Sequence, residues 1–100
     1  MNQKGPQKIT RKDEESIPQF NSQEEAKKWF EDKYEKDFIL TGVDYIGDEK
    51  CYFYYLILDW EEYKRGQKEL KENGYMAGLS FLMSHQPVQI MESGSIHIVH

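Results

Sequence analysis

Few side chains in this sequence are of the types that carry out acid–base chemistry or bind metals: three histidines, one cysteine and scattered carboxylates. His97 and His100 are three residues apart, a spacing that presents two metal ligands on one face of a helix. They lie in a segment with the pattern of a strand, where an odd spacing places them on opposite faces. Because no second cluster supplies the other ligands of a zinc site, the sequence predicts neither a metal nor a cofactor site.

One group of residues could line a small pocket. Asp44 alternates with Gly42 and Ile46, and this pattern would turn its carboxylate inward, where it needs a partner. Gln89 and His97 are expected side by side on one face of a C-terminal hairpin. Asp44, Gln89 and His97 together therefore define a candidate pocket for a small ligand or for acid–base chemistry.

The only cysteine, Cys51, begins an apolar run and is expected to be a small core residue rather than a nucleophile. A reactive thiolate would need positive charge or a helix N-terminus nearby. Phosphate-binding loops, nucleophile elbows and dinucleotide fingerprints are absent from the sequence. With no complete set of catalytic groups, the sequence favours a non-enzymatic protein.

A single cysteine cannot form an internal disulfide, which fits a reducing compartment. Residues 1–12 contain no apolar stretch of the kind that marks a secretory signal. No run of about 18 apolar residues is present to span a membrane. We therefore expect a cytoplasmic protein with no membrane partner, and its wealth of lysine, glutamate, tyrosine and isoleucine suggests a bacterial or phage source.

The net charge of −5 is unevenly distributed. Residues 1–16 hold four basic and three acidic side chains, whereas the remainder holds nine basic and fifteen acidic ones. A domain this acidic gains nothing from releasing counterions on DNA or RNA. Nucleic acid is therefore excluded as an expected partner.

Residues 23–36 form the clearest predicted helix. Ser22 precedes Glu25 by three positions, the spacing of a capping box in which each side chain bonds the other residue's amide. The apolar residues recur at steps of three and four, which is the helical period. The stripe consists of Ala26, Trp29, Phe30 and Tyr34.

Residues 38–46 and 50–58 are rich in β-branched and aromatic side chains, and Gly47-Asp48 between them signals a hairpin. A strand with one wet face should alternate apolar and polar residues, but both faces of residues 50–58 are apolar. We therefore expect this strand to be central and covered on both sides. One face carries Cys51, Phe53, Tyr55 and Ile57, and the other carries Tyr52, Tyr54, Leu56 and Leu58.

A second helix is predicted from its N-cap, Asp59, to Asn73-Gly74, where glycine ends a helix in the left-handed conformation. Residues 75–84 fit the period of a strand and that of a helix equally well. We favour a strand because the segment lies between two turn signals and contains a glycine, and a helix is the alternative.

The C-terminus is predicted to be a second hairpin. A three-residue loop favours glycine at its last, left-handed position, which makes residues 92–94 the loop. This register gathers four apolar side chains on one face, and register follows the buried face. Those side chains are Val88, Ile90, Ile96 and Ile98, while Gln89 and His97 share the other face.

The predicted fold is α+β in two layers, with helices packed on a mostly antiparallel sheet. Residues 1–16 are polar and without period, so we expect a disordered N-terminal tail. Residues 17–100 form the single domain, in the order α-β-β-α, then 75–84 as strand or helix, then β-β.

Tyrosine and tryptophan are enriched at protein interfaces, and an aromatic sheet face without a cover would be one. We predict a small protein-interaction module of the regulator or inhibitor class, binding another protein or itself as a homodimer through an aromatic sheet face or a sheet edge. A small enzyme or ligand-binding protein with the Asp44–His97 pocket is the alternative. The expected interface residues are Tyr52, Tyr54, Trp60, Tyr63 and Tyr75.

Overall fold

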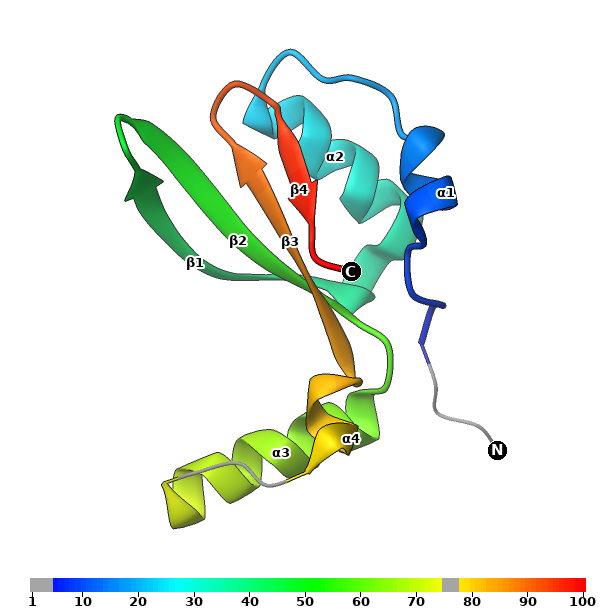
Figure 1. Ribbon diagram of the computed structural model, residues 1–100, viewed down its shortest axis with the longest axis vertical. Coiled ribbons are helices and arrows are strands. Elements are labelled where there is room, and N and C mark those ends of the chain that lie inside the picture. The colour runs from blue at the N-terminus through cyan, green and yellow to red at the C-terminus, as the bar shows by residue number, and fades with distance from the viewer. Residues whose placement is uncertain (1–4, 75–77) are drawn as a thin grey trace.

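The computed structural model describes residues 5–74 and 78–100 and confirms the predicted α+β fold. Its four strands are antiparallel and lie in the sheet in chain order, so that β1 and β4 form the two edges (Figure 1). The strands are β1 (Phe38–Ile46), β2 (Glu49–Ile57), β3 (His85–Met91) and β4 (Ile96–Ile98).

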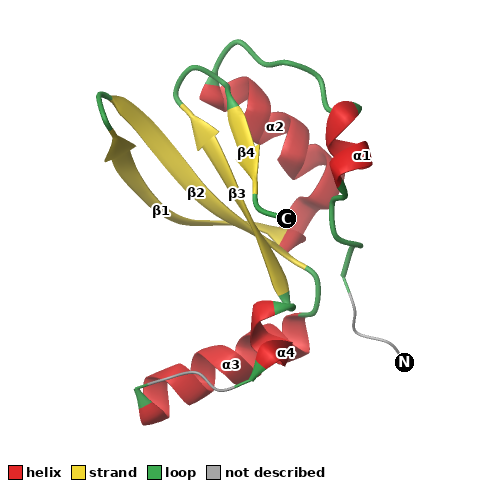
Figure 2. Cartoon of the chain, in the orientation of Figure 1, coloured by secondary structure: helices red, strands yellow, loops and turns green. Residues whose placement is uncertain are grey.

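The helices gather in two separate groups (Figure 2). One group packs on a face of the sheet, and the other projects from the end where β2 leaves and β3 enters. None of the helices in the described part of the chain is long and apolar enough to cross a membrane. They are α1 (Arg11–Glu15), α2 (Gln23–Tyr34), the 3₁₀ turn η1 (Glu35–Asp37), α3 (Trp60–Asn73) and α4 (Leu79–Leu82).

Helix α2 begins at its predicted cap and covers the main core. The Ser22 hydroxyl accepts the Glu25 amide at 3.2 Å, but the Glu25 carboxylate accepts from Asn21 rather than from Ser22. Phe30, fully buried, stacks on Phe38 with ring centroids 4.9 Å apart. This stack joins α2 to the start of β1 and to the rest of the sheet core.

Strand β2 is central, as predicted, and its two faces are covered differently. The face of Tyr54 and Leu56 lies beneath α2 and contributes to the core. The opposite face is met by helices only at its far end, where Tyr55 packs 6.1 Å from Tyr63 of α3 and 4.3 Å from His85. The expected cover on both sides is therefore present along only part of the strand.

The C-terminal hairpin has the predicted three-residue loop. Gly94 adopts a φ of 98°, and the Met91 amide donates to the Ser95 carbonyl at 2.8 Å. The register pairs Ile90 with Ile96 and Val88 with Ile98. Three of these side chains are buried with the core and Ile96 is half-buried, so burial of one face sets the register.

Helix α3 starts at Asp59, which accepts the Glu62 amide at 3.2 Å, and ends at left-handed Gly74. The favoured strand over residues 75–84 does not form: residues 79–82 are helical, and residues 75–77 lie outside the described part. Phe81 explains the difference, because its ring occupies the space that a side chain at Gly66 would need. A Cβ built on Gly66 would lie 1.9 Å from the Phe81 Cδ1 atom.

The structure also differs from the expected disordered tail over residues 1–16. Its described part packs on the domain: Ile9 is 2% exposed, and the Gly5 amide donates to the Leu58 carbonyl at 2.8 Å. Buried Gln86 binds both backbone groups of Ile9, with contacts of 2.9 and 3.0 Å, and donates to the Val99 carbonyl at 3.1 Å. A polar segment can therefore be held on the domain by hydrogen bonds to its backbone, and the pattern of its side chains does not reveal these bonds.

Candidate functional site

The outer edge of β1 combines an open sheet edge with exposed apolar side chains. This nine-residue strand has only β2 as a neighbour, and no described element lies beyond it (Figure 1). Along it, four large apolar side chains are between 44% and 65% exposed. They are Leu40, Val43, Tyr45 and Ile46.

These side chains belong to both faces of the sheet. Leu40 pairs with Tyr54 and therefore lies on the face covered by α2, and Val43 and Tyr45 share that face. Ile46 lies on the opposite face. Thr41 has no partner on β2 and forms a bulge, so that Leu40 and Gly42 act as consecutive positions of the strand.

An edge strand presents unpaired amide and carbonyl groups, and soluble proteins usually protect it with lysine, proline, short length or a cover. Strand β1 contains neither lysine nor proline, and its only charge is Asp44. The Asp44 carboxylate accepts the neighbouring Tyr45 amide at 2.7 Å. The bulge and one carboxylate are thus the only protective devices within this strand.

Two predicted interface residues, Tyr52 and Tyr54, support the core face instead of forming an open aromatic surface. Tyr54 is 2% exposed and its hydroxyl accepts from the Gln23 amide nitrogen at 2.9 Å. Burial is the main cause that raises the pKa of Tyr54 to about 12. Tyr52 is half-buried, and its hydroxyl donates to Glu92 at 3.2 Å.

Trp60 and Tyr63 lie elsewhere, at the base of α3. The Trp60 indole donates to Asp37 at 2.7 Å, and Tyr63 stacks on Phe81 with centroids 5.7 Å apart. Both residues are half-buried and hold α3 and α4 to the sheet. Tyr75 lies outside the described residues, so the predicted aromatic residues do not form one surface in the described molecule.

The residues of the predicted pocket are not brought together. Asp44 is exposed to solvent rather than turned inward, although its cross-strand partner Cys51 is buried. Gln89 and His97 are cross-strand neighbours, as predicted. Asp44 on β1 is three strand spacings from His97 on β4, roughly 14 Å, which is too far for one acid–base site.

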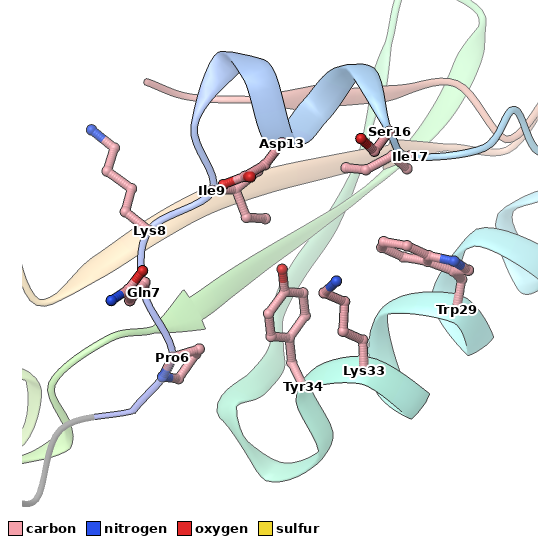
Figure 3. Close-up of a pocket in the computed structure, with 10 residues that line it drawn as sticks. All are labelled: Pro6, Gln7, Lys8, Ile9, Asp13, Ser16, Ile17, Trp29, Lys33 and Tyr34. Carbon is pink, nitrogen blue, oxygen red and sulfur yellow. The ribbon is translucent and has the colours of Figure 1, made fainter.

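A cavity of about 450 Å³ lies between the N-terminal segment and α2 (Figure 3). Lys33 Nζ lies there, 5.4 Å from the Trp29 ring centroid and 5.8 Å from that of Tyr34. Hydrogen bonds with Thr10 lower the pKa of Asp13, whereas burial and, to a smaller degree, Asp13 raise the pKa of Tyr34. Asp13 is therefore ionised and Tyr34 neutral at neutral pH, and neither is poised to transfer a proton.

Cysteine and metal chemistry find little support in the geometry. Cys51 is fully buried, and burial, with a smaller effect of Glu49, raises the pKa of its thiol. A raised pKa leaves little of the reactive thiolate. Across residues 5–74 and 78–100, no three histidine, cysteine or carboxylate side chains lie close enough to hold a metal ion.

The sequence analysis named a sheet edge but none of the four exposed residues that form it. A signal was present, because residues 38–46 contain a single charge. What the sequence lacked was the strand order, which decides whether such a segment is buried at the centre or exposed at the edge. The chain has no significant match among protein-family models, curated proteins or solved structures, so its function must be inferred from its own geometry.

Proposed function

We propose that this protein is a non-enzymatic protein-interaction module that binds an extended strand along the outer edge of β1. The observation that supports it is the combination of an open nine-residue edge and four exposed apolar side chains on one strand. In strand addition, the main chain of the partner supplies hydrogen bonds and its alternate side chains supply specificity.

The apolar positions of β1 suit this mode of binding. Leu40, Val43 and Tyr45 project from one face and Ile46 from the other, so an added strand would gain apolar contacts on both faces. Cross-strand pairs of aromatic and β-branched residues each stabilise a sheet by roughly 0.2–1 kcal/mol. The edge therefore offers both a backbone template and side-chain contacts.

A catalytic role has less support. Asp44 and His97 lie apart, Asp13 is ionised, and the raised pKa of Cys51 disfavours its thiolate. Ser84 Oγ does lie 3.2 Å from His85 Nδ1, but Ser84 is 1% exposed and its hydroxyl donates to the Phe81 carbonyl, so it is not presented to a substrate. The acidic net charge of −5 disfavours nucleic acid as partner. The single, buried cysteine is in keeping with a cytoplasmic setting.

The test is a selection of displayed ten-residue peptides on the immobilised full-length chain. We expect the enriched peptides to carry apolar residues at alternate positions. Their affinity for the Val43→Lys chain should be at least about tenfold lower than for the unaltered chain, because lysine on an edge strand blocks pairing. Leu82→Lys is the matched control, since Leu82 is 63% exposed on α4, away from β1.

Peptides that bind the Val43→Lys chain as well as the unaltered chain would contradict the proposal. A selection that enriches no extended peptide would contradict it equally. Loss of binding in the Leu82→Lys chain alone would move the interaction surface from β1 to α4.

A further inference from the structure

We infer that the occupant of the β1 edge is a second copy of this chain, joined by antiparallel pairing of β1 with β1 about a two-fold axis at Val43. This inference rests on the proposed function and names its partner. Such an interface is isologous, because each residue meets its counterpart by the same operation in both copies. The two four-stranded sheets would become one continuous sheet of eight strands.

The order of residues along β1 is self-complementary about Val43. Antiparallel pairing places opposite residues on the same face of the sheet. Because Thr41 is bulged out, Leu40 and Gly42 count as consecutive positions along the strand. With Val43 opposite Val43, Tyr45 then meets Leu40 of the second copy on one face. On the other face Ile46 meets Ile39 of the second copy.

In this register the exposed apolar side chains of the edge pair with one another. Val43, Leu40 and Tyr45 are 44%, 54% and 65% exposed in the single chain, and all three would lie in one stripe across the joined sheet. Ile46, 50% exposed, would pack against half-buried Ile39 on the reverse face. A shift by one residue would set apolar side chains against the wrong face.

The charges along the strand fit the same register. Asp44 falls opposite Gly42 of the second copy instead of opposite Asp44, which avoids a direct like-charge pair. The start of β1 approaches the turn that follows β1 in the second copy. Lys36, whose side chain is 85% exposed and lies 3.7 Å from Asp37 of its own chain, thus approaches Asp48 and Glu49 of that copy. The Asp37 carboxylate also accepts from the Trp60 indole of its own chain.

The experiment is disulfide trapping with two single substitutions in the full-length chain, Val43→Cys and Tyr45→Cys. Two cysteines can bond only when their Cα atoms lie roughly 4–7 Å apart. The proposed pairing brings the two residues at position 43 face to face but separates the two at position 45 by about four strand positions, roughly 14 Å. Both positions are exposed, and the unaltered chain with buried Cys51 gives the background.

Under a glutathione redox buffer, we expect Val43→Cys to form a covalent dimer at least about tenfold faster than Tyr45→Cys, given that distance limit. Random collision would give the opposite order, because position 45 is the more exposed. Sedimentation equilibrium should show a dimer of the unaltered chain and of Leu82→Lys, and a monomer of Val43→Lys.

Equal trapping at both positions, or a chain that stays monomeric at all concentrations, would overturn the second copy as partner. If that monomer still binds selected strand peptides through a Val43-sensitive edge, the proposed function stands and only its partner is wrong. If it binds none, both proposals fail.

Discussion

The two edges of the sheet are built in opposite ways. Strand β4 has three residues, and the chain segments around it are fastened by Gln86, which binds the backbone of Ile9 and the Val99 carbonyl. On the same side of the sheet, His100 Nε2 lies 2.6 Å from Glu14 Oε1, which joins the C-terminus to the N-terminal segment. Strand β1 has nine residues and no described neighbour beyond β2.

The difference indicates that an open edge is not a necessary consequence of this small fold. The chain uses a buried amide and an N-terminal segment to close one side, where Ile9 is 2% exposed. On the other side it leaves Ile46 50% exposed and supplies no lysine or proline. Edge strands are usually protected against pairing, so a weakly protected edge opposite a closed one favours a role in association.

The largest effect is expected from breaking the closed edge at Gln86. Gln86→Leu would leave the buried Ile9 amide and carbonyl without partners, and each such group costs about 1–3 kcal/mol. We expect the free energy of unfolding to fall by about 4 kcal/mol in urea titrations. Gln89→Leu, three residues along β3 on the other face, is the control and should change it by less than about 1 kcal/mol. Equal losses of stability in the two variants would show that the hydrogen bonds between Gln86 and Ile9 do not stabilise the fold.

A matched pair of isoleucines compares the two edges directly. Ile9→Ala removes a side chain that is 2% exposed and should lower the free energy of unfolding by about 3 kcal/mol, from lost burial and a cavity. Ile46→Ala removes one that is 50% exposed and should cost about 0.5 kcal/mol in the monomer. Thermal and urea unfolding at low protein concentration would measure both. The contrast would be wrong if the two substitutions cost the same.

Acid should weaken a third region, the end of the sheet that carries α3 and α4. Burial is the main cause that lowers the pKa of His85 in the folded protein, so the unfolded chain takes up its proton at a higher pH. The stability due to neutral His85 is complete above pH about 6.5 and falls as the pH decreases. We expect urea midpoints to decline between pH 7.5 and 5.5 more steeply than in His85→Phe, which keeps a ring beside Tyr55. Identical slopes would contradict this assignment.

The smallest effect on stability is expected at the open edge. Val43→Lys replaces a side chain that is 44% exposed, so the free energy of unfolding of the monomer should change by no more than about 0.5 kcal/mol. The same substitution should abolish binding along β1. A large loss of stability would mean that the edge serves the fold itself, and would remove the distinction between the two edges.

Much of the fold could be predicted from local sequence. The Ser22 and Asp59 caps, the Gly74 stop and the Gly94 loop each satisfy backbone groups nearby, so the elements and the register of the second hairpin followed from them. Over residues 75–84 the local period left strand and helix open, and it gave no sign of the close contact between Phe81 and Gly66 that accompanies the helix at residues 79–82.

The two edges were beyond sequence analysis for the same reason. Gln86 and Ile9 are 77 residues apart in the sequence. The polar side chains around Ile9 give no sign that the backbone there is held by hydrogen bonds. The candidate site depended on strand order, which turned Tyr54 into a core residue and left Val43 exposed. Local patterns record which residues form strands, whereas their neighbours in the sheet are set by long-range packing.

Amide hydrogen exchange at low and high protein concentration tests the central claim most directly. If β1 pairs with β1 of a second copy, the outward amides of β1 should exchange more slowly as concentration rises, while those of β4 stay unchanged. Val43→Lys should abolish the effect. Exchange in β1 that is the same at all concentrations, or protection that rises at β4 or α4 instead, would contradict the account.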